Sequence, residues 1–248
     1  MGSIYDETVA VSRRTMVLFF AVDTSGSMEG AKIGALNSAI EDVIPEIRRL
    51  SEENADAQIK IAAIKFDTVA EWLTSAPVNS EFFTWNYLNA GGLTAFGHMC
   101  RCLNEKLSTK AFMNEAAGSF APVIFLLSDG EPTDDYSASL NQLKENNWFK
   151  KAVKVAVAVG DDANKEVLRE FTGNSESVLT VYNPETLKKM IRFVSVTASQ
   201  IASKSSSNAV SMEHGETMPD TIVTKQEEFN KALSAMELDD IDDDSLVW

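Results

Sequence analysis

The chain has 248 residues, of which 44% are hydrophobic, and its formal net charge is −15 at pH 7. This length and apolar content are typical of one large globular domain followed by a shorter segment. The acidic balance argues against a nucleic-acid-binding protein, because neutralising phosphates requires a basic surface. It suits solubility, or partners that are basic or carry a metal.

The cysteines and the apolar runs bear on the compartment. Cys100 and Cys102 are the only cysteines, and with one residue between them they form a poor disulfide framework, which favours a reducing cytosol. Arg13 and Arg14 before the apolar residues 16–22 resemble the start of a signal peptide, but that run is short and leads into Asp23 without a cleavage site. No segment reaches the roughly 20 apolar residues that span a bilayer. We expect a cytoplasmic protein that does not contact a membrane.

Strands and helices are predicted to alternate along most of the chain. Residues 16–22 (MVLFFAV) form a continuous apolar run, which predicts a strand covered on both faces. Residues 31–50 have apolar side chains at helical spacing, and Pro45 is expected to kink or divide that helix. Further strands are expected at residues 58–66, 69–73, 121–127, 152–159 and 178–181, and helices at residues 97–107, 136–149, 165–171 and 184–201.

This alternation predicts an α/β fold with a doubly wound, mostly parallel sheet of about six strands and helices on both faces, as in Rossmann-like proteins. Ligands of such sheets bind beyond the carboxyl ends of the strands. The domain is expected to span residues 15–202, after a lead-in of residues 1–14. Residues 203–248 are predicted to be a Ser-rich linker and a flexible acidic tail.

The loop after the first strand, residues 23–27, reads DTSGS and suits a metal site. Ser25 and Ser27 can direct hydroxyls at one hard cation, with Gly26 between them for an unusual backbone turn, and Asp23 can orient the waters of the ion. Thr94, in the loop GGLTAFG, and Asp129, after the strand at residues 121–127, are expected at the same edge of the sheet. All five ligand side chains offer oxygen, which favours Mg²⁺ or Mn²⁺ over zinc.

Other interpretations of these residues are weaker. Alone, the DTSGS loop also fits a turn and a helix N-cap. A Mg²⁺-dependent phosphotransferase of the haloacid dehalogenase kind would need a second acid where this chain has Ser25. The sequence has no phosphate-binding glycine loop and no Gly-x-Ser-x-Gly elbow. A zinc site at His98, Cys100 and Cys102 is disfavoured, because on a helix Cys100 points away from the face that the other two share. We therefore expect no enzymatic activity.

At Asp23, Ser25, Ser27, Thr94 and Asp129 the chain resembles the von Willebrand factor A family and its metal-ion-dependent adhesion site. The resemblance covers residues 15–201 and departs from the family at Leu93, which stands where the family commonly has Gly-Gly-Thr without an insertion. It implies a bound Mg²⁺, with Mn²⁺ or Ca²⁺ as alternatives, that binds an Asp or Glu carboxylate of a protein partner. A shell dominated by hydroxyls leaves such an ion positively charged and with an open position.

Within that family, residues 126–135 (LLSDGEPTDD) and 93–97 (LTAFG) resemble the bacterial TerY-like subgroup associated with tellurite resistance. This resemblance implies an adaptor in a bacterial stress-response or signalling system, with a Ser/Thr kinase and a PP2C-type phosphatase as partners. The alternatives are a metal-site module coupled to an AAA+ ATPase, as in chelatase-like systems, and, less favoured, a Mg²⁺-dependent phosphohydrolase.

The C-terminal segment combines acidic and apolar residues. Residues 227–238 fit a short amphipathic helix with Phe229, Leu233 and Met236 on one side, and the sequence ends at Trp248. These four side chains are expected to dock on a partner, although the surrounding charge also fits a solvated tail. The aspartates of the tail are a further candidate ligand for the metal site, in the same copy or a neighbouring one.

Overall fold

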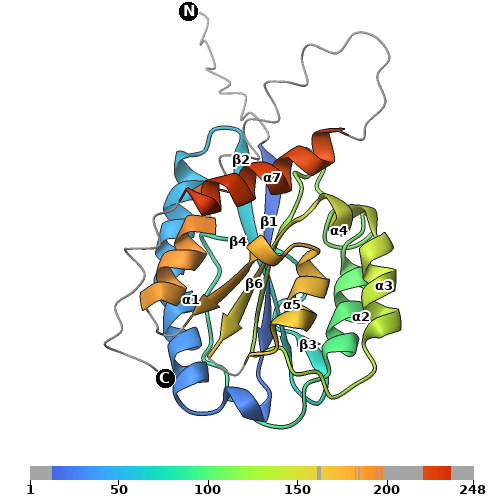
Figure 1. The fold of residues 1–248 in the computed structure, drawn as a ribbon. Helices are drawn as coiled ribbons and strands as arrows, with labels where there is room; N and C mark the ends of the chain where they lie inside the picture. Colours follow the sequence, from blue (N-terminus) through green and yellow to red (C-terminus); the bar gives the residue numbers. More distant parts are fainter. Residues whose placement is uncertain are drawn as a thin grey trace, which may run out of the picture.

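The fold is a seven-stranded sheet between two layers of helices (Figure 1). The computed structural model describes residues 13–160, 163–181, 183, 185–194, 196–197 and 220–235. The strands lie in the order β3-β2-β1-β5-β6-β7, and β4 also pairs with β2. Their bounds are β1 Arg14–Asp23, β2 Ala57–Phe66, β3 Ala70–Trp72, β4 Val78–Asn79, β5 Val123–Ser128, β6 Val153–Val159 and β7 Val178–Val181.

The sheet is mostly parallel, as predicted. Strands β2, β1, β5, β6 and β7 run in one direction, and β3 and β4 run antiparallel to β2. The two-residue strand β4 was not expected, because a strand that short leaves no pattern in the sequence. Asp23 lies opposite Phe66 of β2, and Val22 lies opposite Leu127 of β5. The register therefore brings the carboxyl ends of β1, β2 and β5 to one edge of the sheet.

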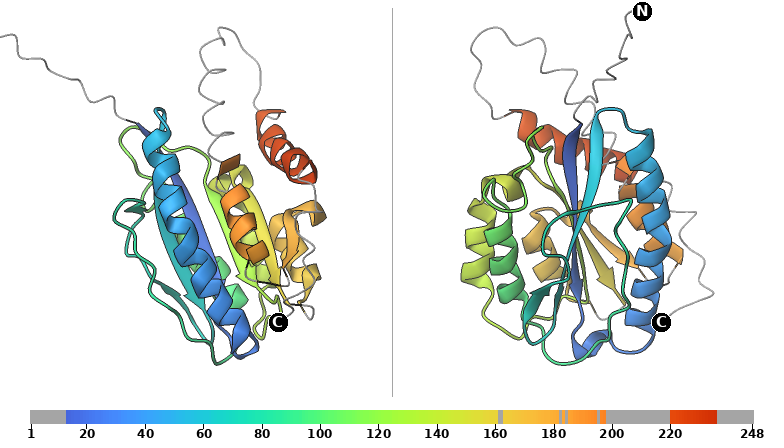
Figure 2. Two further views of the ribbon diagram at one scale, coloured as in Figure 1. Left: turned by 90° about the vertical axis from the view of Figure 1, so that its left-hand side faces the viewer. Right: turned by 180° about the vertical axis from the view of Figure 1, so that it is seen from behind.

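Helices cover both faces of the sheet. A helix at residues 185–194 lies with α1 on one face, while α2, α3 and α5 cover the other (Figures 1 and 2). The bounds of the helices are α1 Ala31–Glu53, α2 Phe96–Lys106, α3 Ser137–Glu145, α4 Asn147–Lys151, α5 Lys165–Thr172 and α7 Asp220–Ser234, with 3₁₀ helices η1 Gly26–Met28 and η2 Ser175–Ser177. None of the helices in the described part of the chain has the length and apolar character needed to cross a membrane.

Strand β1 shows why the central strands are apolar without interruption. Successive side chains of a strand point to opposite faces of the sheet. Met16, Leu18 and Phe20 accordingly join the core cluster under α1, whereas Val17 and Phe19 join the cluster under α2. All five side chains are completely buried. This confirms the prediction of a strand that is covered on both faces.

One helix contains a proline without being divided by it, and another differs from its predicted form. The helix α1 continues through Pro45 undivided, because Ile40, Ile44 and Ile47 stay buried along one face and hold it against the sheet. The helix expected at residues 136–149 is divided into α3 and α4 at Asn146. The Asn146 side chain accepts hydrogen bonds from the backbone N–H groups of Trp148 and Phe149, which caps α4 and starts a new helix.

The helix α7 packs on the domain, although the sequence placed it in a free tail. Phe229 is completely buried and Leu233 is 8% exposed, and both belong to the core cluster under α1. The Gln226 side chain accepts a hydrogen bond from the Lys154 N–H at 3.1 Å and donates one to the Lys154 carbonyl at 3.4 Å. The pairing of β7 with β6 begins only at Ala156. The Gln226 side chain therefore satisfies the backbone groups of Lys154 that a neighbouring strand would otherwise bond.

This packing corrects the expectation that Phe229 and Leu233 dock on a partner. Their apolar surface is removed from water within the chain itself, which stabilises the fold and leaves little to offer a partner. Met236 and Trp248, the other two expected docking residues, lie outside the described residues, as do residues 1–12, 198–219 and 236–248. The predicted lead-in, linker and acidic tail therefore stay predictions.

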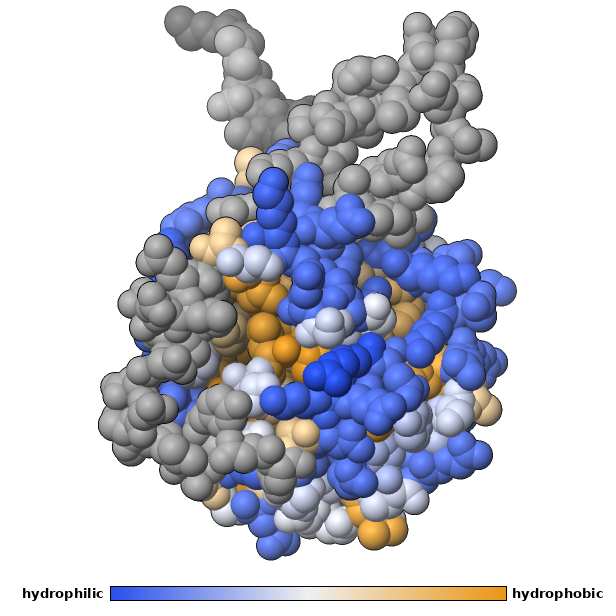
Figure 3. Space-filling view, in the orientation of Figure 1, coloured by the Kyte–Doolittle hydropathy of each residue, from blue (hydrophilic) through white to orange (hydrophobic). Residues whose placement is uncertain are grey.

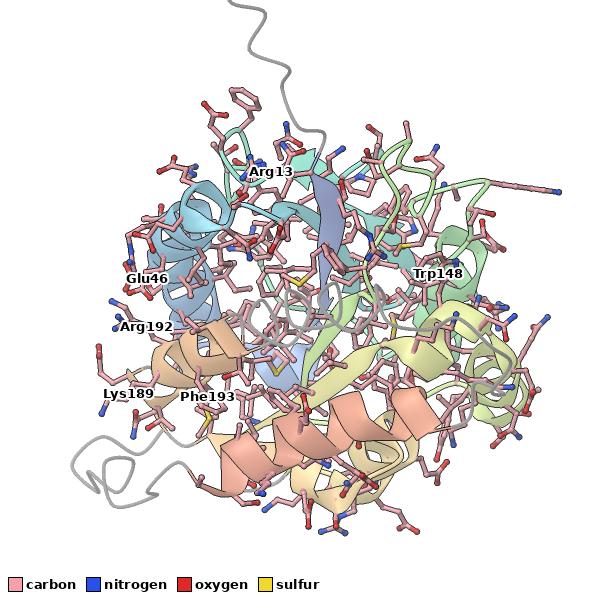
Figure 4. All side chains as sticks on the ribbon, turned by 90° about the horizontal axis from the view of Figure 1, so that it is seen from above. Arg13, Glu46, Trp148, Lys189, Arg192 and Phe193 are labelled. Carbon is pink, nitrogen blue, oxygen red and sulfur yellow. The ribbon has the colours of Figure 1, made fainter. Side chains whose placement is uncertain are left out.

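Ion pairs and an aromatic contact join the helices of this layer. Arg192 extends from the helix at residues 185–194 to Glu46 of α1, with Nε and Oε2 2.7 Å apart (Figure 4). The Phe193 ring lies 6.3 Å from the Phe229 ring of α7, centre to centre. The outward surface of the described part is mostly hydrophilic in the view of Figure 3, with an apolar area near its centre. The helices thus turn their polar sides to solvent, as amphipathic helices do.

Candidate metal centre

Asp23 is the last residue of β1 and is completely buried. Its Oδ1 accepts a hydrogen bond from the Ser25 N–H at 2.9 Å, and its Oδ2 accepts one from the Ser128 hydroxyl at 2.6 Å. Burial raises the pKa of Asp23 to about 6, although these hydrogen bonds oppose the shift. The ionised carboxylate is therefore costly at this position, and a nearby cation would stabilise it.

Ser25 and Ser27 follow in the loop that enters η1. Their hydroxyl oxygens lie 3.0 Å apart, close enough for both to reach one small ion. Gly26 was expected to supply an unusual backbone turn, but its φ is not positive. Its role is close approach instead: its N–H donates to the Gly92 carbonyl at 3.2 Å, and a Cβ would lie 3.3 Å from that oxygen.

The second loop brings Thr94 to the same edge of the sheet. The Gly91 N–H donates to the Thr24 carbonyl at 2.8 Å, which fastens this loop to the first. Thr94 is 4% exposed, and Thr133 holds it in place. The Thr94 N–H donates to the Thr133 hydroxyl at 2.9 Å, and the Thr133 N–H donates to the Thr94 carbonyl at 3.0 Å. Gly92 has a φ of +81°, and a Cβ there would lie 2.5 Å from the Thr68 hydroxyl.

Asp129 follows β5 and is 3% exposed. Both of its carboxylate oxygens are buried, and neither has a hydrogen-bond partner among the described residues. Lys32 Nζ lies 3.6 Å from Oδ2, which is ion-pair distance but longer than a hydrogen bond. A buried carboxylate without hydrogen bonds costs several kcal/mol. Such a group is expected where the oxygens face a bound cation.

Hydrogen bonds join each of the three loops to the other two. The first loop follows β1, the second contains Thr94, and the third follows β5. The Asp23–Ser128 hydrogen bond joins the first loop to the third, and the Gly26–Gly92 hydrogen bond joins the first to the second. The hydrogen bonds between Thr94 and Thr133 join the second loop to the third. The loops that carry the five predicted ligands therefore lie together, as the sequence predicts. That these five side chains bind a metal stays a prediction.

The chemistry of the donors fits a hard divalent cation. The described residues contain no group of three or more His, Cys, Asp or Glu side chains placed to hold a metal. The ligands of a cation here would be the hydroxyls of Ser25, Ser27 and Thr94 with the carboxylates of Asp23 and Asp129. Oxygen donors of this kind suit Mg²⁺.

Sequence reasoning missed several residues that shape this site. Ser128 was visible as a small hydroxyl residue beside Asp129, but its bond to Asp23 depends on the pairing of β1 with β5. Thr133 and Lys32 have no local signal, because their contacts cross between loops and helices. Asp134 accepts hydrogen bonds from the N–H groups of Gly97 and His98 and so satisfies the start of α2.

The residues of the weaker zinc interpretation have structural partners. His98 Nδ1 accepts a hydrogen bond from the Ala70 N–H at 3.1 Å, which fastens α2 to β3. Cys100 is buried, and burial raises the pKa of its thiol, so the thiolate that zinc requires is disfavoured. His98 therefore has a structural hydrogen bond, and Cys100 and Cys102 pack in or against the core cluster under α2.

Comparisons with known proteins give matches in structure and none in sequence. No protein-family model and no curated protein matches the chain. A von Willebrand factor type A protein from Catenulispora acidiphila superposes with a TM-score of 0.53 and 17% identity, covering 74% of this chain and 42% of that one. The ArnB paralog VWA2 from Sulfolobus acidocaldarius gives 0.53 and 18%, covering 73% and 45%.

A third match is proximal thread matrix protein 1 from the mussel byssus, in a structure with a zinc-occupied adhesion-site motif. Its TM-score is 0.53 at 20% identity, covering 76% of this chain and 46% of that one. This chain therefore spans less than half the length of these three proteins. Identities this low show a shared fold, and the chain has the α/β fold of von Willebrand factor A domains.

Proposed function

We propose that this von Willebrand factor A-like domain is a non-enzymatic interaction module that binds an Asp or Glu carboxylate of a protein partner through a Mg²⁺ ion. The observation that carries the proposal is Asp129, whose buried carboxylate accepts no hydrogen bond from the described residues, has Lys32 at ion-pair distance, and lies beside loops rich in hydroxyls. Asp23, Ser25, Ser27 and Thr94 would hold the ion together with Asp129.

The five residues would contribute to cation binding in different ways. Both oxygens of Asp23 already accept hydrogen bonds, so Asp23 contributes mainly its negative charge. Ser25, Ser27 and Thr94 offer neutral oxygens, and Asp129 offers a carboxylate that pairs with Lys32 but accepts no hydrogen bond from the described residues. When bound, the ion supplies a positive centre that attracts a carboxylate of the partner. Because both Asp23 oxygens already accept hydrogen bonds, direct ligands that are mostly neutral hydroxyls would leave the ion with positive charge to attract that carboxylate.

The finer assignment rests on resemblance and is part of the same proposal. Residues 126–135 and 93–97 resemble the TerY-like subgroup, which favours a cytoplasmic adaptor of a bacterial stress response that acts with a Ser/Thr kinase and a PP2C-type phosphatase. We propose Mg²⁺ rather than Mn²⁺ or Ca²⁺, because the candidate ligands are all oxygens and Mg²⁺ is a small ion that binds oxygen. The zinc-occupied motif of the mussel protein supports a divalent cation at the corresponding loops.

Calorimetric titration with Mg²⁺ alone tests the metal site. We expect wild type to bind and Asp129→Asn and Asp23→Ala to lose binding. Asp135→Ala is the matched control, because Asp135 is an exposed acid of the same loop and accepts a hydrogen bond from the Ser137 N–H. Equal Mg²⁺ binding by wild type and Asp129→Asn would overturn the proposed site.

Selection from a peptide library tests the ligand. Peptides retained by wild type in Mg²⁺ and released by EDTA are expected to share an Asp or Glu, and Asp129→Asn is expected to retain none of them. Metal-independent retention, or retained peptides without an acid, would contradict carboxylate binding.

A further inference from the structure

Large apolar side chains are exposed in two places along one side of the domain. Leu93, in the loop of the candidate ligand Thr94, is 57% exposed, and Val69, in the turn between β2 and β3, is 44% exposed. Leu73 is 41% exposed and Phe82 67%, and they lie beyond the other end of β3. Strand β3 thus connects a metal-side pair, Val69 and Leu93, with an apolar groove at Leu73 and Phe82.

The metal-side pair is fastened to the candidate ligand Thr94. Leu93 directly precedes Thr94, and its N–H donates to the Thr68 hydroxyl at 3.3 Å, next to Val69. The Ala95 N–H donates to the Asp67 carbonyl at 2.7 Å. Neither apolar side chain offers a ligand to a cation. Both side chains are exposed and are therefore available to a ligand of that cation.

The groove has a volume of about 340 Å³. Its apolar lining consists of Leu73, Val78, Phe82, Phe83, Trp85 and Leu88. The backbone of this segment is held by α1: the Trp85 indole N–H donates to the Asn37 side chain at 3.0 Å, and Arg48 donates to the carbonyls of Ser80 and Phe83 at 2.9 and 2.6 Å. The groove is therefore preformed, which reduces the entropic cost of binding.

Strand β3 lies at the edge of the sheet. Among the described strands it pairs with β2 alone, and the β2 side of the sheet faces the viewer in the right-hand view of Figure 2, between α1 and the α2–α3 layer. Val69 and Leu73 are four residues apart, which is about 13 Å along a strand. An extended ligand along this edge would place its two apolar side chains about four residues apart.

The negative charge along this edge favours a ligand with few acidic residues. Glu71 lies between Val69 and Leu73 with its side chain 57% exposed, and Lys65 is shared between Glu71, at 3.1 Å, and Asp67, at 3.4 Å. The edge is thus negative on balance, in a chain of net charge −15. A ligand with several acids would be repelled away from the cation. The tail of this chain, with six acids in residues 237–244, is disfavoured for that reason.

We propose that the ligand of the metal centre is an extended protein segment with a single carboxylate, an aliphatic side chain beside it that packs on Leu93 and Val69, and a second apolar side chain about four residues away that fills the groove at Leu73 and Phe82. This inference rests on the proposed carboxylate-binding function and names the class of partner. The groove gives the segment its direction along β3, and the metal fixes its register.

A displayed random peptide library with one fixed Asp is the probe, selected in Mg²⁺ and eluted with EDTA. Wild type is expected to enrich an aliphatic residue within two positions of the Asp and an apolar residue about four positions further. Leu93→Ser should lose the first preference and Phe82→Ser the second. Tyr87→Ser is the matched control, because Tyr87 is 58% exposed but lies outside the lining of the groove.

Synthetic copies of the enriched peptide give the affinities. We expect Leu93→Ser and Phe82→Ser each to weaken binding about tenfold, the effect of losing a buried apolar contact, while calorimetry with Mg²⁺ alone is unchanged. EDTA-sensitive peptides without apolar preferences would overturn this inference and leave the carboxylate-binding function intact. Absence of any EDTA-sensitive enrichment would overturn both. A peptide of residues 236–248 that binds wild type as tightly as the enriched peptide would also contradict the inference.

Discussion

The Ser128 hydroxyl donates a 2.6 Å hydrogen bond to the Asp23 carboxylate, and this bond ties the carboxyl end of β5 to that of β1. With the Ser25 N–H bound to the other oxygen, the Asp23 side chain is held from two loops. The carboxylate is completely buried and close enough to Asp129 for their charges to repel. The burial of these two carboxylates therefore lowers the stability of the metal-free protein, and a bound cation would offset that loss.

Asp23→Asn separates that cost from metal binding. Because burial raises the pKa of Asp23 to about 6, the wild-type carboxylate is largely ionised at pH 7 and destabilises the metal-free protein. We expect the variant to be about 1–3 kcal/mol more stable than wild type in EDTA, by urea denaturation. Added Mg²⁺ should stabilise wild type alone. A variant that is less stable in EDTA, or equally stabilised by Mg²⁺, would contradict this account.

Gly130→Ala should damage both the fold and the centre. Gly130 has a φ of +75°, and a Cβ there would lie 2.5 Å from the Asn164 carbonyl oxygen, next to the 2.6 Å hydrogen bond from the Asn164 N–H to the Asp129 carbonyl. We expect a loss of about 2–4 kcal/mol in unfolding free energy and weaker Mg²⁺ binding by calorimetry.

The control for this prediction is Gly173→Ala. Gly173 has a φ of +77° but no atom of the described residues within 4 Å of the added Cβ, so this variant carries the conformational cost of about 1 kcal/mol without the clash. Equal losses of unfolding free energy in the two variants would show that the contact with Asn164 does not destabilise Gly130→Ala.

Phe229→Ala tests whether α7 is part of the domain. Phe229 is completely buried, and its removal should lower the unfolding free energy by about 3–5 kcal/mol. Mg²⁺ affinity should be unchanged, because α7 contacts the start of β6 and the centre lies at the carboxyl ends of the strands (Figure 1). Glu228→Ala, at an exposed position of the same helix, is the control and should change neither quantity. A free tail would instead show no loss of stability on removing Phe229.

Lys154 gives a pH dependence in the alkaline range. Its Nζ donates to the carbonyls of Phe149 and Ala152, and burial lowers its pKa from 10.5 to about 8. Between those pH values the unfolded chain binds the proton more tightly than the folded one, so the unfolding free energy rises with pH.

We expect wild type to gain about 1–3 kcal/mol relative to Lys154→Met between pH 8 and 10.5, by denaturation at a series of pH values. Lys150→Met replaces an exposed lysine that is paired with Glu145. Its unfolding free energy should change with pH in parallel with that of wild type. Parallel curves for Lys154→Met as well would contradict the shift.

The central strands of the domain were accessible from the sequence because buried parallel strands are apolar throughout. Residues 16–22, 121–127 and 152–159 each carried that signal, and each forms a central strand, as β1, β5 and β6. The loops of the centre were accessible for the same reason, because a hydroxyl-rich motif directly after such a strand must lie at the sheet edge. In contrast, the two-residue strand β4 and the division of α3 from α4 at Asn146 depend on local hydrogen bonds with weak sequence signals.

The sequence by itself determined the class of fold and the edge at which DTSGS and Asp129 meet, since the apolar pattern of a strand is local and a helix between two strands makes them parallel. Tertiary structure decided the partners of those residues. Ser128 reaches Asp23 through the pairing of β1 with β5, and Thr133 holds Thr94 across two loops. It also decided where Phe229 lies: an amphipathic helix carries the same pattern whether it packs on a partner or on its own sheet, and the open edge of β6 at Lys154 receives it.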